Sequence, residues 1–332
     1  MPRAFHRLLA ALLLAAPATV PAQDKGRLEP EAEETLSAIV RVRAKIIANA
    51  RSLQTLGPER EGSGVLVRPG YVATIGYLVI EAESIEVTGA DGKSAPATVA
   101  AYDHASGFGL LRLLAPLAGK PISLGDSRAL VERAPVLAAT HSGADGLSLV
   151  HVVSRRPFSG SWEYHLDSAI FTYPPVMNWS GASLIGSKGE LLGLGSLIVG
   201  DAAGGGTQSP GNMFVPIDLL KAILDDLIAR GKAAGPVRPW LGINTEEARG
   251  RLFVTRVSPD GPAERAGLKS GDIVIGVGNE EVSSLAEFYR RIWARGAAGI
   301  EVPLKILQGV QVKEVTVRSI DRVEYFRGKT SY

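Results

Sequence analysis

The sequence predicts a mainly β chain that folds as about two domains. Short apolar runs separated by turns recur along it, and 38 glycines and 20 prolines accompany only 6% aromatic residues among 332 residues. With 45% hydrophobic and 21% charged residues, the chain can bury a substantial core. Its length corresponds to about two domains. Frequent turns between short strands favour a β-sandwich or β-barrel over a helical bundle.

Residues 1–22 have the pattern of a signal peptide. Arg3, His6 and Arg7 form a short basic region, and residues 8–16 form an apolar run too short to cross a bilayer. Small residues before Gln23 provide a cleavage site. The alternative is an uncleaved anchor, but no later run reaches the roughly 20 apolar residues of a transmembrane helix. We therefore expect a periplasmic or secreted mature protein without a membrane-spanning segment.

The charge balance and the lack of cysteine exclude several classes of function. Lys and Arg total 36, Asp and Glu total 34, and Arg3 and Arg7 leave with the signal peptide. A neutral mature chain argues against nucleic acid or a membrane surface as the main partner. The absence of cysteine excludes disulfides, a thiol nucleophile and thiolate metal sites. No histidine pair has the spacing of two ligands on one helix face, so we expect no metal ion and no cofactor.

The mature chain begins with a charged leader and continues as strands. Residues 24–35 are rich in charged side chains. Residues 39–46 alternate apolar and basic side chains, as a half-buried strand does. Residues 62–67 and 71–74 flank a Pro69-Gly70 turn and indicate a strand, a tight turn and a strand. Further short strand patterns follow at 84–87, 98–100 and 109–113.

A helix and a linker mark a domain boundary. Residues 216–228 carry apolar side chains at helical spacing, with Pro216 in the first turn and Gly231 as the expected stop. Residues 231–239 read as a linker. Before the helix, residues 201–211 form a glycine-rich surface loop, and phosphate binding there is disfavoured because no strand–loop–helix pattern surrounds it.

The residues after the linker predict a separate compact domain. A helix is expected over residues 284–293, capped by Ser283 or Ser284, with Glu287 placed as the acid of a capping box. Strands are expected at 253–257, 273–277, 302–306 and 312–317. The resulting plan is a signal peptide at 1–22, a leader with the first strand at 23–60, a β-domain at 61–235, a C-terminal domain at 236–322 and a tail at 323–332.

Motifs in the C-terminal domain resemble a bacterial PDZ domain. The run from Ser258 to Val274 carries the resemblance, and Trp240-Leu241-Gly242-Ile243 is similar to the loop that binds a peptide carboxylate in that family. Consecutive backbone N–H groups around Gly242 are suited to an anion, and the next strand is suited to a peptide added at its edge. The alternative is a PDZ fold that serves only as a packing module.

The order of the whole mature chain resembles the HtrA/Deg family. Gly62-Ser63-Gly64-Val65, Leu124-Gly125-Asp126-Ser127 and Phe214-Val215-Pro216-Ile217 match the opening strand, the middle and the entry to the last helix of its protease domain. The resemblance implies a chymotrypsin/trypsin-like double β-barrel, a closing helix and a PDZ domain. It also implies trimers formed through aromatic residues near the mature N-terminus, but residues 23–60 contain no Phe, Trp or Tyr.

The catalytic positions of the family are only partly kept. Ser180 stands at the nucleophile position in Asn178-Trp179-Ser180-Gly181, but Tyr77 stands where the family has its histidine and Gly107 where it has its aspartate. A phenol with a pKa near 10 is a poor general base at neutral pH. Asn178 replaces the glycine whose amide, with that of Ser180, would form the oxyanion hole. We therefore interpret the chain as a pseudoprotease, since a serine needs a base that removes its proton.

The mature chain has four histidines, His104, His141, His151 and His165. His104, three residues before Gly107, is the best candidate for a replacement base, although a surface loop histidine is the favoured interpretation. His151 and His165 lie on either side of an Arg155-Arg156-Pro157 segment interpreted as a turn, and both are expected to be exposed.

Three functions remain open at this stage. The first is a non-catalytic protein of envelope quality control that binds unfolded or C-terminal peptides through the PDZ groove and the protease-like cleft. The second is an active serine endopeptidase whose Ser180 is activated unusually by His104 or Tyr77. The third is a regulatory subunit of an active HtrA relative. Partners are thus peptides or unfolded proteins, with a homo-oligomer or an active relative as further expectations.

Overall fold

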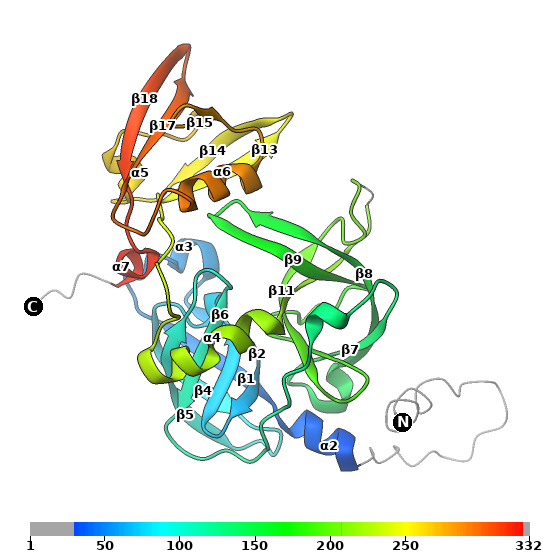
Figure 1. The fold of residues 1–332 in the computed structure, drawn as a ribbon. Helices are drawn as coiled ribbons and strands as arrows, with labels where there is room; N and C mark the ends of the chain where they lie inside the picture. Colours follow the sequence, from blue (N-terminus) through cyan, green and yellow to red (C-terminus); the bar gives the residue numbers. More distant parts are fainter. Residues whose placement is uncertain (1–29, 207, 328–332) are drawn as a thin grey trace, which may run out of the picture. The chain divides into compact units, whose positions relative to one another are not determined.

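The computed structural model describes residues 30–206 and 208–327, so the signal peptide predicted at 1–22 lies outside the described residues. The chain divides into two compact units (Figure 1). Of the described residues, those of 30–155 and 169–233 form one unit, and those of 156–168 and 234–327 form the other. The second unit therefore includes a short excursion from the middle of the chain.

The first unit begins with a closed six-stranded β-barrel, coloured blue to cyan in Figure 1. Its strand order is β1-β2-β3-β6-β5-β4. The strands are β1 (Ile39–Ile46), β2 (Glu59–Arg68), β3 (Tyr71–Ile75), β4 (Ala82–Thr88), β5 (Ser94–Tyr102) and β6 (Phe108–Leu113). The strand predicted at 39–46 is confirmed as β1. Helices α2 (Pro30–Ser37) and α3 (Leu53–Leu56) and the 3₁₀ turn η1 (Gly76–Leu78) flank these strands.

A second closed six-stranded barrel, coloured green, completes the double barrel that the resemblance implied. Its order is β10-β11-β12-β9-β8-β7. The strands are β7 (Pro135–Ala139), β8 (Leu147–Gly160), β9 (Tyr164–Tyr173), β10 (Ser183–Ile185), β11 (Leu191–Val199) and β12 (Gly211–Pro216). Short 3₁₀ turns η2 (Ser127–Ala129) and η3 (Gly143–Gly146) flank β7. The turn proposed at residues 155–157 is wrong, because these residues lie inside the long strand β8.

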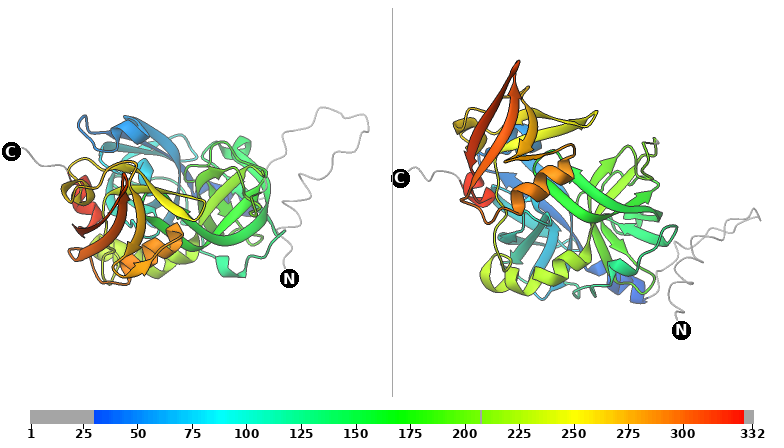
Figure 2. Two further views of the ribbon diagram at one scale, coloured as in Figure 1. Left: turned by 90° about the horizontal axis from the view of Figure 1, so that it is seen from above. Right: turned by 45° about the horizontal axis from the view of Figure 1, so that its top comes forward.

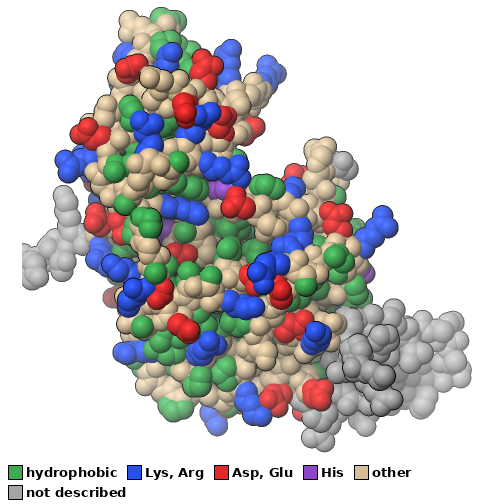
Figure 3. Space-filling view, in the orientation of Figure 1, with side chains coloured by type: hydrophobic (Ala, Val, Ile, Leu, Met, Phe, Trp, Pro, Cys, Tyr) green, Lys and Arg blue, Asp and Glu red, His purple; other side chains and the backbone are tan. Residues whose placement is uncertain are grey.

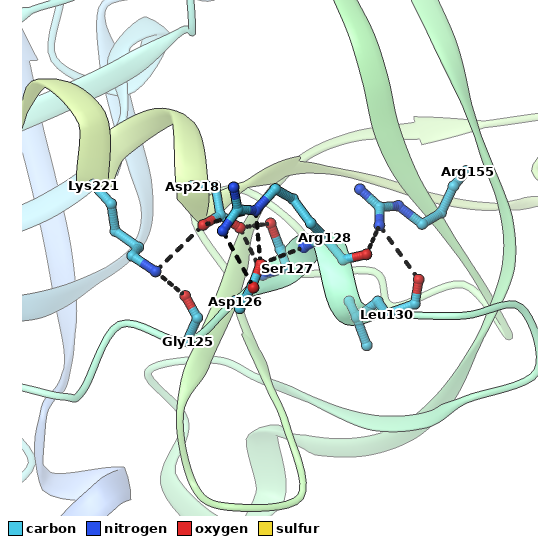
Figure 4. A network of polar contacts seen from close by, with 8 residues as sticks. All are labelled: Gly125, Asp126, Ser127, Arg128, Leu130, Arg155, Asp218 and Lys221. Atoms are coloured by element: carbon cyan, nitrogen blue, oxygen red, sulfur yellow. Dashed lines mark hydrogen bonds and ion pairs between the residues drawn. The ribbon is translucent and has the colours of Figure 1, made fainter.

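A polar network joins the closing helix α4 (Ile217–Arg230) to the loop before the second barrel (Figure 4). The carboxylate of Asp218 accepts hydrogen bonds from the Ser127 amide at 2.6 Å and the Ser127 hydroxyl at 2.5 Å. Lys221 donates to the Gly125 carbonyl at 2.7 Å. The Gly125–Ser127 motif therefore fixes the first turn of α4, and the helix ends where predicted, with Gly231 in the left-handed conformation at φ 70°.

The second unit is a sheet with the order β13-β14-β15-β17-β18, covered by helix α6. The strands are β13 (Ile243–Ala248), β14 (Arg251–Val257), β15 (Ile273–Val277), β16 (Glu280–Glu281), β17 (Glu301–Gln308) and β18 (Gln311–Arg318). The helices are α5 (Pro262–Arg265), α6 (Leu285–Trp293) and α7 (Arg322–Phe326). Figure 2 shows α6, coloured orange, beside the sheet. Its residues Phe288, Tyr289 and Ile292 are buried in the core of this unit. The predicted cap is confirmed, since the Ser284 hydroxyl accepts from the Glu287 amide.

Basic and acidic side chains are interspersed on the molecular surface. On the face that Figure 3 shows, Lys and Arg side chains alternate with Asp and Glu side chains over both units. Such mixing matches the near balance of charges in the sequence. Among residues 30–206 and 208–327, no helix is both long enough and apolar enough to cross a membrane.

Candidate functional site

Ser180 lies in the loop between β9 and β10, and tight backbone packing fixes its position. The Ser63 amide donates to the Ser180 carbonyl at 2.8 Å. A Cβ on Gly62 would lie 2.6 Å from that carbonyl oxygen, and a Cβ on Gly181 would lie 1.9 Å from the Ser63 carbonyl oxygen. Gly181 also has φ 73°, which glycine adopts without strain. The Gly62-Ser63 and Ser180-Gly181 segments thus pack backbone against backbone, and each needs its glycine for the other to approach so closely.

Tyr77, in η1, holds the hydroxyl of Ser180. Its phenol oxygen lies 2.9 Å from Ser180 Oγ and 2.9 Å from the carbonyl oxygen of Ser196. A phenol has one proton and a carbonyl can only accept, so both contacts are satisfied together when Tyr77 donates to Ser196 and Ser180 donates to Tyr77. Burial raises the pKa of Tyr77 to about 12. The phenolate form that could remove a proton from Ser180 is therefore even rarer at neutral pH than that of an ordinary phenol.

The region around Gly107, where the resemblance places an aspartate, is closed by a turn and an aromatic ring. Gly107 has φ 85°, its amide donates to the Asp103 carbonyl at 2.7 Å, and its carbonyl accepts from the Gly76 amide at 2.8 Å. The Asp103 carboxylate accepts from both the amide and the hydroxyl of Ser106. A Cβ on Gly76 would lie 2.1 Å from the ring of Tyr102. Asp103 thus closes its own turn, and Tyr102 packs directly on the residue before Tyr77.

The histidines do not supply a base to Ser180. Within the described residues, the hydrogen bond on Ser180 Oγ is the one with Tyr77. The His104 ring packs on Tyr102 with ring centroids 4.0 Å apart. His141 Nδ1 lies 3.1 Å from Ser63 Oγ, and burial lowers the pKa of His141. His141 thus bonds to Ser63, whose amide holds the Ser180 carbonyl, and not to the Ser180 hydroxyl.

His165 corrects a prediction, whereas His151 is exposed as expected. His165 is buried, because its ring contacts Ser159 Oγ at 2.8 Å, Asp167 Oδ1 at 3.2 Å and Arg290 at 3.0 Å. Burial, followed by the charge of Arg290, lowers the pKa of His165. Sequence reasoning placed it beside a turn that is in fact strand, which is why its burial was missed.

The two amides predicted for the oxyanion hole belong to an accessible loop. Asn178 is exposed and Ser180 is half-exposed, and Asn178 is not among the described residues with positive φ. The loop is anchored at Val176, whose amide and carbonyl both bond the Asn212 side chain, at 2.6 and 3.1 Å. The oxyanion role of Asn178 and Ser180 stays a prediction. Among the described residues, no group of three or more carboxylate or imidazole side chains is placed to hold a metal ion.

The loop at the start of β13 holds a carboxylate of the chain itself. The amides of Leu241, Gly242 and Ile243 donate to the carboxylate oxygens of Glu163 at 2.8, 2.7 and 3.0 Å. Gly242 has φ 86°, which turns its N–H toward the same side as its neighbours. Trp240, which sequence reasoning grouped with these residues, instead pairs its backbone with Ile320 and packs its ring on Tyr325.

Glu163 was not found by sequence reasoning. It lies 78 residues before Leu241 and carries no motif of its own. The one signal is an acidic residue between two aromatic residues at a hairpin end, Trp162-Glu163-Tyr164. Burial raises the pKa of Glu163 to about 6, and the three amides and Arg322 act in the opposite direction.

Comparisons with known proteins agree with this architecture. The model of the trypsin-like peptidase domain matches residues 62–194, and the model of the PDZ domain matches residues 239–318. Protease Do-like 1, chloroplastic, of Arabidopsis thaliana is 28% identical over 311 residues, covering 86% of this chain and 69% of that protein. The periplasmic pH-dependent serine endoprotease DegQ of Escherichia coli strain K12 is 29% identical over 273 residues, covering 77% of this chain and 58% of that protein. The chain thus spans about three fifths of the length of the DegQ sequence.

Solved structures share the fold. The HtrA-type protease AlgW with a decapeptide has a TM-score of 0.54 at 19% identity, covering 88% of this chain and 98% of that one. The serine endoprotease of Yersinia pestis has a TM-score of 0.52 at 23% identity, covering 88% and 96%. The fold is a trypsin-like β-barrel domain followed by a PDZ domain, as predicted. The chain thus combines a trypsin-like peptidase domain with a C-terminal PDZ domain, and it is similar to HtrA/Deg proteases over most of its length.

Proposed function

We propose that this protein is an exported peptide-binding member of the family that holds unfolded or C-terminal polypeptide segments in envelope quality control without cutting them. One observation carries the proposal: the amides of Leu241, Gly242 and Ile243 converge on a single carboxylate. A free C-terminus presents the same group to a PDZ loop. Family members named as periplasmic and chloroplastic proteases, and AlgW structures with bound peptides, support peptide as the ligand class and an exported location.

The barrel centre supports holding over cutting. Motif order puts Ser180 at the nucleophile position, but its hydroxyl bonds to the phenol of Tyr77, whose pKa burial raises to about 12. Gly107 has no side chain that could orient a base. Loss of a triad removes about 10⁶-fold in turnover, so the remaining backbone groups leave only slow chemistry. Strand addition to the cleft uses backbone groups and does not need the triad.

A peptide-binding titration tests the proposal on the mature chain. The probes are one labelled peptide with a free C-terminus and the same peptide with an amidated C-terminus, measured by fluorescence anisotropy. We expect saturable binding of the free acid only, together with intact casein in a parallel degradation assay. Equal binding of both forms, or binding of neither form by the mature chain and by its Glu163→Ala variant alike, would overturn the proposed carboxylate recognition.

A serine endopeptidase is the second candidate, because the Ser180 hydroxyl is kept and half-exposed. A fluorophosphonate probe labels an activated serine, and Ser180→Ala is the matched control. Under the proposal the mature chain is not labelled and casein is not degraded. Labelling or casein cleavage that disappears in Ser180→Ala would instead establish the endopeptidase.

A further inference from the structure

At the tip of the hairpin between β8 and β9, Glu163 has a backbone conformation and a burial that require hydrogen bonds from residues outside the hairpin. Glu163 has φ 57°, a left-handed value that a non-glycine residue adopts at a cost of about 1–2 kcal/mol. Its residue is only 7% exposed. A carboxylate is stable in such a place only when hydrogen bonds compensate for lost hydration. The amides of Leu241, Gly242 and Ile243 provide them.

The backbone before Glu163 runs along the edge of the PDZ sheet. The Thr245 amide donates to the Ser161 carbonyl at 2.9 Å. β13 is the edge strand of its sheet, so these groups are on its unpaired side. The chain advances from Ser161 to Glu163 while its partners run back from Thr245 to Ile243, so the two segments are antiparallel. This is the arrangement of a peptide added to the strand with its last carboxylate at the loop.

Two further elements hold the same segment. From α6, the Tyr289 hydroxyl donates to the Gly160 carbonyl at 2.8 Å and accepts from the Glu163 amide at 3.3 Å. From α7, Arg322 donates to the Trp162 carbonyl at 3.1 Å. Backbone groups of residues 160–163 are therefore bonded from β13, α6 and α7. Several of these contacts use backbone atoms that any peptide possesses.

We propose that residues 160–163 are an internal ligand of the PDZ groove, and that a polypeptide with a free C-terminal carboxylate binds only by displacing Glu163 from the loop at Leu241–Ile243. The inference rests on the proposed peptide-binding function and adds its regulation. Three amides fully used by one carboxylate cannot also receive a second, and two carboxylates at one site repel each other. The free protein is thus autoinhibited by its own hairpin.

The test measures binding of a defined probe to the full mature chain and its variants. The probe is a fluorescein-labelled peptide of residues 155–162 followed by valine with a free carboxylate, and its amidated form is the ligand control. Glu163→Ala and Glu163→Gln remove the charge, and Tyr289→Phe removes the bond to Gly160. Glu314→Ala, an exposed acid on β18, is the matched control. Circular dichroism verifies that each variant is folded.

We expect Glu163→Ala to bind the free acid at least tenfold more tightly than the wild type, with smaller gains for Glu163→Gln and Tyr289→Phe. Glu314→Ala should bind as the wild type does. Hydrogen exchange at the amides of residues 241–243 should accelerate in Glu163→Ala without any peptide.

The outcomes separate this inference from the proposed function. Equal affinity of wild type and folded Glu163→Ala for the free acid would overturn the internal ligand and leave peptide binding intact. Faster exchange in Glu163→Ala, with no variant binding any free acid, would support the internal ligand and overturn the peptide-binding function. Unchanged exchange at residues 241–243 would overturn the internal ligand by itself.

Discussion

The centre of the double barrel and the carboxylate loop of the PDZ unit differ in which groups each site has and in what those groups bond to. Around Ser180 the backbone contacts are tight, and under the proposed function Tyr77 and Gly107 stand where a protease would carry its base and the residue that orients it. At Leu241–Ile243 the binding groups are all present, but Glu163 uses them. Under the proposed function, the first site lacks a base, whereas the second has its binding groups and is occupied. Only the second can be restored by moving a side chain.

The largest effect should come from breaking the backbone support of Ser180. In Gly181→Ala, the new Cβ would lie 1.9 Å from the Ser63 carbonyl at φ 73°, so the loop must move. We expect a loss of about 3 kcal/mol or more in unfolding free energy, measured by urea denaturation. Gly143→Ala is the matched control, since Gly143 has φ 64° with nothing within 4 Å. It should lose only about 1 kcal/mol, and equal losses would contradict a specific role for this contact.

The next effect concerns pH and the occupied loop. The pKa of Glu163 is about 6 when docked and 4.5 ordinarily, so docking takes up a proton between these values. Protonation of Glu163 therefore contributes fully to the free energy of docking below pH 4.5. This contribution, about 2 kcal/mol in total, is lost as the pH rises through 6. The charge of Arg322 opposes the rise in the pKa of Glu163, and the Tyr289 hydroxyl beside the Glu163 backbone stays neutral because burial raises its pKa.

Amide exchange at residues 241–243, corrected for intrinsic rates, measures this change. Protection should be greater at pH 5 than at pH 7.5, and the difference should disappear in Glu163→Gln. Protection that rises with pH would show that the amides favour the charged carboxylate more than burial opposes it.

A smaller effect is expected at the phenol of the barrel. Tyr77→Phe removes the donor to the Ser196 carbonyl and the partner of Ser180. One lost hydrogen bond at a half-buried site costs about 1 kcal/mol, measured as a lower Tm. Tyr71→Phe, another half-buried tyrosine of the same barrel, is the comparison variant. If Tyr77→Phe were more stable than the wild type, the phenol would be strained rather than supportive.

The smallest effect should follow repair of the triad. Tyr77→His combined with Gly107→Asp returns both residue types, but residue 107 has φ 85° and Tyr102 packs against Gly76. An aspartate at residue 107 is strained at this φ, so it is not held where it could orient the histidine. We expect no casein degradation above that of Ser180→Ala. Serine-dependent cleavage by the double variant would show that the barrel lost only side chains and kept its catalytic geometry.

Local patterns in the sequence predicted most of the fold. The strand at 39–46, the helix that stops at Gly231 and the cap at Ser284 each depend on neighbouring residues, and all three are confirmed. The positions of Ser180, Tyr77 and Gly107 came from motif order. What could not be predicted depends on distant contacts. Burial of His165 and docking of Glu163 both arise where the long β8–β9 hairpin meets residues more than 70 positions away.

Because residues 160–163 belong to the same polypeptide, their concentration near the groove does not fall when the protein is diluted. A tethered segment acts at an effective concentration of order 1 mM. The C-terminus of another polypeptide competes with the hairpin only when it is present at high concentration or makes side-chain contacts that the hairpin lacks. The groove would then stay unbound while free C-termini are scarce and bind them only when they accumulate. The hairpin thus sets a threshold concentration of free C-termini for binding.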